Sequence, residues 1–152
     1  MKTIDTLLAD YASYHRTRGN VAAHAVGITL ILFGTVSLLG SLHIGALGPI
    51  APLTAAEVII GISFLFYLSL NVPVALAMLG ELAALDVVAR AVNDWRVGLI
   101  AFAVGWVFQG IGHAVYEKNS PAFLKNLVHL MVGPAFLLNE LLKIRPVPGP
   151  AK

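Results

Sequence analysis

Apolar runs of membrane-spanning length constrain this chain more than any other feature of its sequence. The run over residues 21–42 is long enough to cross the roughly 30 Å of hydrocarbon in a bilayer. Of the 152 residues, 58% are hydrophobic and only 12% are charged, which is too apolar for a soluble domain with one core. The sequence therefore predicts an all-α, polytopic membrane protein.

Hydrophobic periodicity divides the chain into four to five apolar helices and a short N-terminal helix that is too polar to span. The expected ranges are 3–16 for an interfacial helix and 21–42, 54–70, 74–92, 97–117 and 122–143 for the apolar helices. Asn20 can cap the first apolar helix, and Asp86 and Arg90 are four residues apart and can pair. We expect one membrane-embedded domain over residues 1–145 and a proline-rich tail over residues 146–152.

Charge and cysteine content exclude several classes of function. The net charge of +2 is slight and the sequence has no basic tract, so we expect no nucleic-acid partner. The basic residues are instead expected to flank the membrane, and lipid is an expected partner. Because the chain has no cysteine, thiolate metal sites and cysteine nucleophiles are excluded.

One stripe of polar side chains stands out at the end of the fourth apolar segment. Trp106, Gln109, His113 and Glu117 recur at steps of three and four, so they share one face of a helix. Ionisable residues at the end of a membrane helix are costly and usually face the protein interior, which makes them candidate site residues. The His113 and Glu117 pair can hold a metal ion, or it can be a hydrogen-bonded pair inside a bundle.

An even number of crossings brings distant histidines to one side of the membrane. If the first four apolar helices all span, the start of the first and the end of the fourth share a face, whichever face that is. This face then carries Glu117 and four of the five histidines, namely His15, His24, His113 and His129. Imidazoles with carboxylates and no thiols favour a metal such as Fe(II). His43 is expected to lie alone on the opposite face.

Four blocks of the sequence resemble the small membrane family of 2-hydroxy fatty acid dioxygenases. The blocks are Tyr11-x-x-Tyr14-His15, Asn20-x-x-x-His24-x-x-Gly27, Trp106-x-x-Gln109-x-x-Gly112-His113-x-x-x-Glu117-Lys118-x-x-Pro121-Ala122 and Pro134-x-Phe136-x-x-x-Glu140. The resemblance covers nearly the whole chain. It implies an Fe(II)-dependent enzyme that uses O2 to remove one carbon from a 2-hydroxy fatty acid, giving an aldehyde shortened by one carbon.

The resemblance also assigns roles to individual residues. His15, His24 and His113 correspond to the family histidines and are expected to bind iron. His129, which falls outside the family pattern, is a further candidate ligand. Glu117 and Tyr14 are candidate catalytic residues that can hold an imidazole in place. The expected substrate-binding residues are Arg16, Arg18, Trp106, Gln109 and Lys118, of which the cationic ones can orient the carboxylate.

Two other classes of function compete with the dioxygenase. One is a non-enzymatic bundle that binds or transports a lipid or an ion through a polar relay of histidines and acids. The other is a zinc-dependent lipid hydrolase that uses a metal-bound water. We also expect a bacterial inner membrane with the histidine face in the cytoplasm, but basic residues are divided between both faces, so the positive-inside rule itself favours neither orientation. The sequence does not predict an oligomeric state.

Overall fold

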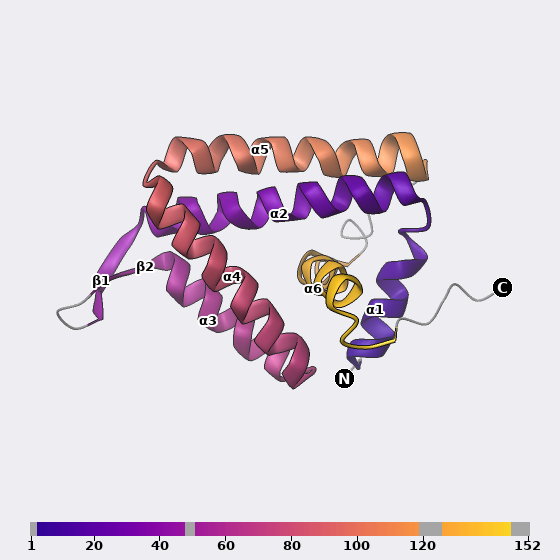
Figure 1. Ribbon diagram of the computed structural model, residues 1–152, viewed down its shortest axis with the longest axis horizontal. Helices are drawn as coiled ribbons and strands as arrows, with labels where there is room; N and C mark the ends of the chain where they lie inside the picture. The colour runs from indigo at the N-terminus through magenta and orange to yellow at the C-terminus, as the bar shows by residue number, and fades with distance from the viewer. Residues whose placement is uncertain (1–2, 48–50, 119–125, 147–152) are drawn as a thin grey trace.

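The computed structural model describes residues 3–47, 51–118 and 126–146 as a helical bundle with one small hairpin (Figure 1). The elements in chain order are α1 (Ile4–Ser13), α2 (Arg18–Gly40), β1 (His43–Leu47), β2 (Ala51–Thr54), α3 (Ala55–Leu68), α4 (Val72–Val92), α5 (Trp95–Ile111), the π-helix η1 (Gly112–Glu117) and α6 (His129–Leu142). The predicted all-α membrane bundle is confirmed, and each predicted apolar helix has a counterpart. The residues between Gly40 and Pro52, expected as a connection, include most of the antiparallel pair β1 and β2.

Helices α2 and α5 form the long axis of the molecule and run antiparallel along each other (Figure 1). Glycines spaced seven residues apart on each helix bring the two backbones together. A Cβ atom at Gly105 would lie 2.7 Å from the carbonyl oxygen of Gly27, and one at Gly34 would lie 2.6 Å from that of Gly98. Such small residues permit close helix packing in lipid, where the hydrophobic effect between helices is absent.

The start of α2 differs from the prediction in one respect. Thr17, not Asn20, caps the helix, and its hydroxyl accepts the backbone N–H of Asn20 at 3.3 Å. Asn20 lies inside the first turn and is fully buried. Both residue types are good N-caps, so sequence alone does not separate them.

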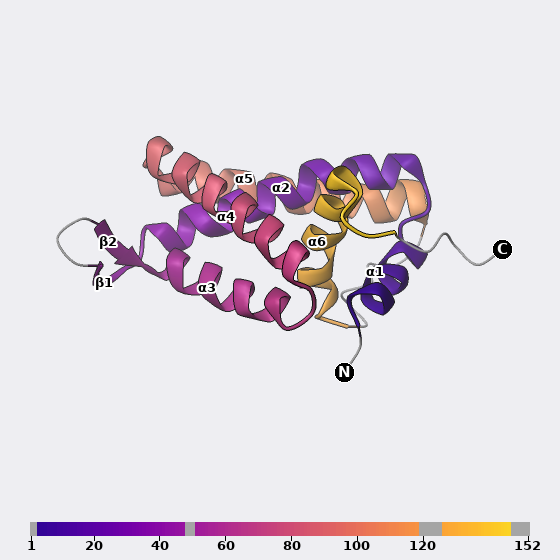
Figure 2. The same cartoon turned by 60° about the horizontal axis from the view of Figure 1, so that its bottom comes forward.

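Helices α3 and α4 form a second antiparallel pair that crosses the first at an angle (Figures 1 and 2). Thr54 and Glu57 form a capping box that begins α3, and the Asn71 side chain caps α4. The predicted pair between Asp86 and Arg90 is confirmed, with 2.7 Å between Arg90 Nε and Asp86 Oδ2. Arg90 also pairs with Glu57, which ties α4 to α3.

Three helical segments of the described chain are long and apolar enough to cross a membrane: Arg18–Gly40, Val72–Val92 and the continuous Trp95–Glu117. Helix α3 is apolar but has only 14 residues. At 1.5 Å per residue it extends about 21 Å, which is short of the roughly 30 Å hydrocarbon core. The ends of α2 and α5 meet because these two helices pack antiparallel, so their meeting does not require α3 to span.

Helices α1 and α6 fill the space beside the α3–α4 pair, near the start of α2 (Figure 2). The apolar side of α1 is buried against residues of α3, α4 and α6, among them Tyr67, Met78 and Phe136. The guanidinium of Arg145 holds the Asp5 carboxylate through two hydrogen bonds of 2.7 and 2.8 Å, which joins α1 to the segment after α6. Residues 119–125, with the start of the predicted 122–143 helix and the motif residues Pro121 and Ala122, lie outside the described residues, as does most of the predicted tail, residues 147–152.

Candidate metal centre

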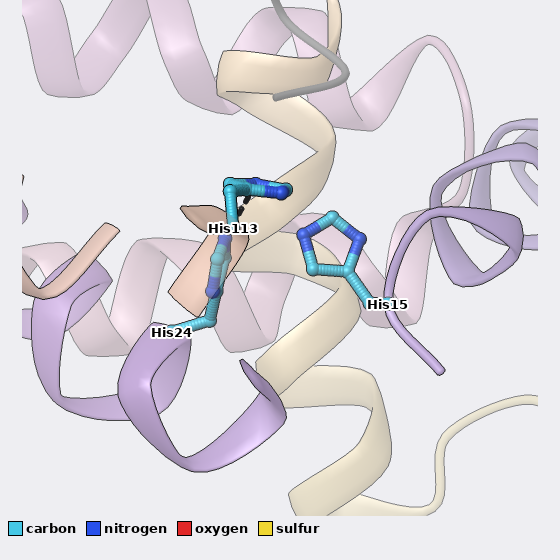
Figure 3. Close-up of side chains that lie close together, drawn as sticks. All are labelled: His15, His24 and His113. Carbon is cyan, nitrogen blue, oxygen red and sulfur yellow. Dashed lines mark hydrogen bonds between the residues drawn. The ribbon is translucent and has the colours of Figure 1, made fainter. Parts of the chain in front are cut away.

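Three histidines from three separate segments meet at the end of the bundle where α2 begins and η1 lies (Figure 3). His15 follows the last turn of α1, His24 lies near the start of α2, and His113 belongs to η1. Each offers a ring nitrogen, and these three atoms lie within 4.8 Å of one another. All three side chains are buried. The predicted meeting of His15, His24 and His113 is thus present in the structure.

Backbone carbonyls fix the tautomers of two of these histidines. His15 Nδ1 donates to the Tyr11 carbonyl oxygen at 2.8 Å, and His24 Nδ1 donates to the Asn20 carbonyl oxygen at 3.0 Å. In both cases the acceptor lies four residues earlier in the chain. With the proton held on Nδ1, the lone pair of each ring is on Nε2, which is the usual arrangement of a histidine that binds a metal.

The geometry and protonation of the three rings fit a metal ion. His24 Nε2 and His113 Nε2 are 3.1 Å apart. Two nitrogens at about 2.1 Å from one ion, with an angle of 90° to 109° between them, lie about 3.0 to 3.4 Å apart. His15 Nε2 is buried and has no hydrogen-bond partner in the described structure. Burial lowers the pKa of His15 to about 4, so the ring is neutral near pH 7. A neutral imidazole with an unsatisfied buried nitrogen is a ready ligand.

The π-helix η1 and one glycine bring His113 close to His24. Residues 112–117 form a single wide turn that continues α5, a feature that often marks functional sites. A Cβ atom at Gly112 would overlap Asn20 Oδ1 and would lie 2.9 Å from His24 Nδ1 and 3.0 Å from His24 Cε1. Only a residue without a side chain leaves room here for both the Asn20 side chain and the His24 ring.

Glu117 lies beside the three histidines, and its carboxylate accepts hydrogen bonds from backbone N–H groups and not from an imidazole. Its Oε1 accepts the backbone N–H groups of Arg16 and Thr17 at 2.6 and 2.7 Å, and the Thr17 hydroxyl at 3.1 Å. Glu117 is not among the three residues whose ligand atoms converge. The carboxylate therefore fastens the segment next to His15 to the end of η1, four residues after His113.

A cavity of about 70 Å³ adjoins the three histidines. Trp106 and Gln109 line it, as the polar stripe predicts, and Gln109 Nε2 is buried without a hydrogen-bond partner in the described structure. The remaining wall is largely apolar and comes from α2 and α6, with Ile28, Ile31, Leu32, Leu130, Gly133 and Pro134. The cavity has room for a small polar group or O2 and is far too small for a fatty-acyl chain.

The other predicted site residues lie around this centre. His129 lines the same cavity, but it is not one of the three converging histidines. Tyr14 packs edge-on against His129, with ring centroids 5.9 Å apart. Arg16, Arg18 and Lys118 are exposed at the same end of the bundle and do not line the cavity. His43, on β1, lies at the far end of α2 from the histidine centre, as expected.

Two residues near the centre went unassigned in the sequence analysis. Tyr11 stacks on the His15 ring with centroids 3.9 Å apart and planes 10° from parallel. The spacing of four residues on one helix was a usable signal for this contact. Asp10 lies 3.1 Å from His129 through Oδ2 and Nε2. These two residues are 119 positions apart, and no local pattern connects them.

Together the fold and the site define a membrane helix bundle with a buried three-histidine site that can hold a metal ion. Comparison with known proteins supplies the family. The profile of the family described as "Mpo1-like: 2-hydroxy-palmitic acid dioxygenase Mpo1-like" matches residues 1–144. The chain belongs to this family.

A curated relative agrees with this assignment. The chain is 31% identical over 141 residues to the 2-hydroxy-palmitic acid dioxygenase MPO1 of Saccharomyces cerevisiae, and the match covers 89% of this chain and 77% of the yeast protein. No solved structure matches the chain. The family resemblance in the sequence motifs is therefore confirmed.

Proposed function

We propose that this protein is an Fe(II)-dependent dioxygenase of 2-hydroxy fatty acids, which cleaves the bond between the first and second carbons and releases an aldehyde shortened by one carbon. The observation that carries the proposal is the convergence of three buried imidazoles beside a small cavity. Membership of the Mpo1-like family, and the similarity to a yeast 2-hydroxy-palmitic acid dioxygenase, support the substrate and the use of O2.

His15, His24 and His113 are the residues that would hold the iron. Three protein ligands leave positions open, and a bound Fe(II) ion would supply the redox chemistry with O2 that no side chain can provide. The protein's own contribution is to fix the three rings. The Tyr11 and Asn20 carbonyl oxygens set the tautomers of His15 and His24.

The cavity beside the histidines is suited to the polar head of the substrate. Gln109 Nε2 is a buried donor with no partner among the described residues, so it can bind a carboxylate oxygen without first breaking a hydrogen bond. Trp106 and the apolar residues of α2 and α6 would contact the first carbons of the chain. The rest of the acyl chain would lie along the outer surface of the helices, where many large apolar side chains are exposed.

The exposed cations and the location in the cell complete the proposal. Arg16, Arg18 and Lys118 stand at the histidine end, where they can attract a carboxylate before it enters the cavity. A bacterial inner membrane with this end in the cytoplasm stays a prediction.

The test is metal content and oxygen consumption in detergent-purified protein. We expect one iron per chain and O2 uptake with 2-hydroxyhexadecanoic acid. His113→Ala should abolish both while the protein stays folded, because the buried His113 imidazole borders the cavity and belongs to neither hydrophobic core cluster. His43→Ala, an exposed histidine at the opposite end, should leave both unchanged. Wild-type protein that holds zinc and consumes no O2, or a His113→Ala variant with full iron content, would contradict the proposal.

A further inference from the structure

A second polar pair, His129 with Asp10, lies beside the site. His129 lines the cavity and is not among the three histidines whose ligand atoms converge. His129 begins α6, and its side chain is only 3% exposed. Its Nε2 lies 3.1 Å from Asp10 Oδ2, near the end of α1. A carboxylate can only accept a hydrogen bond, so the proton of a neutral His129 ring is on Nε2 and the lone pair is on Nδ1.

The orientation of the His129 ring is fixed by aromatic neighbours. Tyr11 and Tyr14 both pack edge-on against it, each with centroids 5.9 Å away and with interplanar angles of 62° and 71°. Tyr11 also stacks on His15. The same α1 segment therefore sets the position of one predicted metal ligand and of the His129 ring.

A purely structural role leaves one feature of this pair unexplained. A histidine that only joined α1 to α6 would have both ring nitrogens hydrogen-bonded, as buried polar atoms generally do. His129 Nδ1 is buried and has no partner among the described residues. The ring lines the cavity beside His15, His24 and His113. A ligand bound in the cavity can supply the hydrogen-bond donor that the buried His129 Nδ1 lacks.

We propose that His129 Nδ1 accepts a hydrogen bond from the 2-hydroxyl group of the substrate, and that Asp10 is a positioning residue that keeps the proton on Nε2. This inference rests on the proposed function for the identity of the substrate. Gln109 and His129 then bind different parts of the substrate head group. The amide donates to the carboxylate, and the imidazole accepts from the hydroxyl.

This arrangement gives the site a means to recognise the hydroxyl. A fatty acid without a 2-hydroxyl leaves His129 Nδ1 unsatisfied in a buried place, which costs binding energy. The same holds for a 2-methoxy acid, which keeps all three oxygens of the head group but has no proton to donate at the second carbon. The methyl ether is also bulkier by one methyl group, so the hydrogen bond to His129 is measured as the part of the preference that a substitution of His129 removes.

The test compares two substitutions of His129, each of which keeps the hydrogen-bonding group of one ring nitrogen and removes that of the other. In His129→Gln the side-chain amide reaches the position of Nε2, so the contact with Asp10 is kept and the acceptor at Nδ1 is lost. In His129→Asn the shorter amide reaches the position of Nδ1, so an acceptor is kept and the contact with Asp10 is lost. Affinities for 2-hydroxyhexadecanoic and 2-methoxyhexadecanoic acids are measured without O2 on iron-loaded protein, together with iron content.

We expect wild-type protein to prefer the hydroxy acid by about tenfold or more, from one buried hydrogen bond. His129→Gln should bring the ratio to within about twofold with iron content unchanged, and His129→Asn should keep most of the preference. A His129→Gln variant that keeps the wild-type ratio, or that loses its iron, overturns the inference. Wild-type protein that binds neither acid and consumes no O2 would instead overturn the proposed function.

A second variant keeps the test decisive if His129→Gln does not fold. Asp10→Asn preserves the shape of the pair but offers an amide N–H to Nε2, which moves the ring proton to Nδ1 and removes the acceptor. The same affinity ratio should fall, and an unchanged ratio overturns the proposal.

Discussion

Replacing Gly112 by alanine should weaken metal binding while the protein stays folded. Gly112 has a helical φ of −52°, so alanine fits the backbone and the effect comes from the added methyl group alone. That methyl would overlap Asn20 Oδ1 and would lie 2.9 Å from His24 Nδ1 and 3.0 Å from His24 Cε1, where ordinary contacts begin at 3.4 Å. The Asn20 side chain must therefore move aside, and the His24 ring must retreat by about half an ångström, which is the tolerance within which a ligand must be held.

The expected loss of metal affinity follows from the role of His24 as a ligand whose orientation is disturbed. Disturbing a group that orients a metal ligand typically lowers metal affinity by about 10- to 100-fold. Gly110→Ala is the matched control, because it lies two residues earlier and a Cβ there meets no atom within 4 Å. It should leave metal affinity unchanged and raise helix stability by up to about 1 kcal/mol.

The assay is the iron-to-protein ratio after equilibration with graded concentrations of a chelator. Thermal unfolding in the same detergent shows that both variants are folded. If Gly112→Ala and Gly110→Ala retain iron equally well, the close approach of η1 to α2 does not position His24, and the reasoning is refuted.

Three other expected outcomes concern packing, protonation and the Glu117 contact. Gly105→Ala should destabilise the protein by about 1–3 kcal/mol in thermal unfolding, because its methyl would meet the Gly27 carbonyl oxygen at 2.7 Å, and stability equal to wild type would contradict the packing described. The folded-state pKa of His15, about 4, lies below the ordinary 6.5, so the unfolded chain takes up the proton first and metal-free protein should lose up to about 3 kcal/mol as the pH falls from 6.5 to 4. Unfolding measured across that range should show a shallower loss in His15→Gln, and identical slopes would count against the burial of His15. Glu117→Ala leaves the backbone N–H groups of Arg16 and Thr17 without their acceptor, so unfolding experiments should show a loss of about 1–3 kcal/mol and elemental analysis a lower iron content. Full stability and full iron content in that variant would exclude the role described for the carboxylate.

The sequence predicts the helices well because a membrane-spanning helix needs a long apolar run, and most of this chain consists of such runs. The count of crossings predicts that His15, His24 and His113 share one face of the membrane. In the structure these histidines meet because α2 packs antiparallel on α5, which places the start of α2 beside the end of α5 and does not require the 14-residue α3 to span.

The finer features of the site depend on contacts that no local pattern contains. Asp10 approaches His129 only after α1 packs on α6. Glu117 appeared to be a candidate for holding an imidazole, but its acceptor oxygen faces the backbone N–H groups of Arg16 and Thr17. The π-turn that carries His113 also has no sequence signature, because the spacing of His113 and Glu117 fits an ordinary α-helix equally well.

The contribution of α1 to the centre has a consequence for biosynthesis. His24 and His113 can meet as soon as α2 and α5 are inserted, whereas α1 packs on α6, which is translated after α5. Glu117 can already hold the segment next to His15 at this stage, but Tyr11, which stacks on His15, is fixed only once α6 has packed against α1. Of the three imidazoles, that of His15 is therefore the last to take its final position.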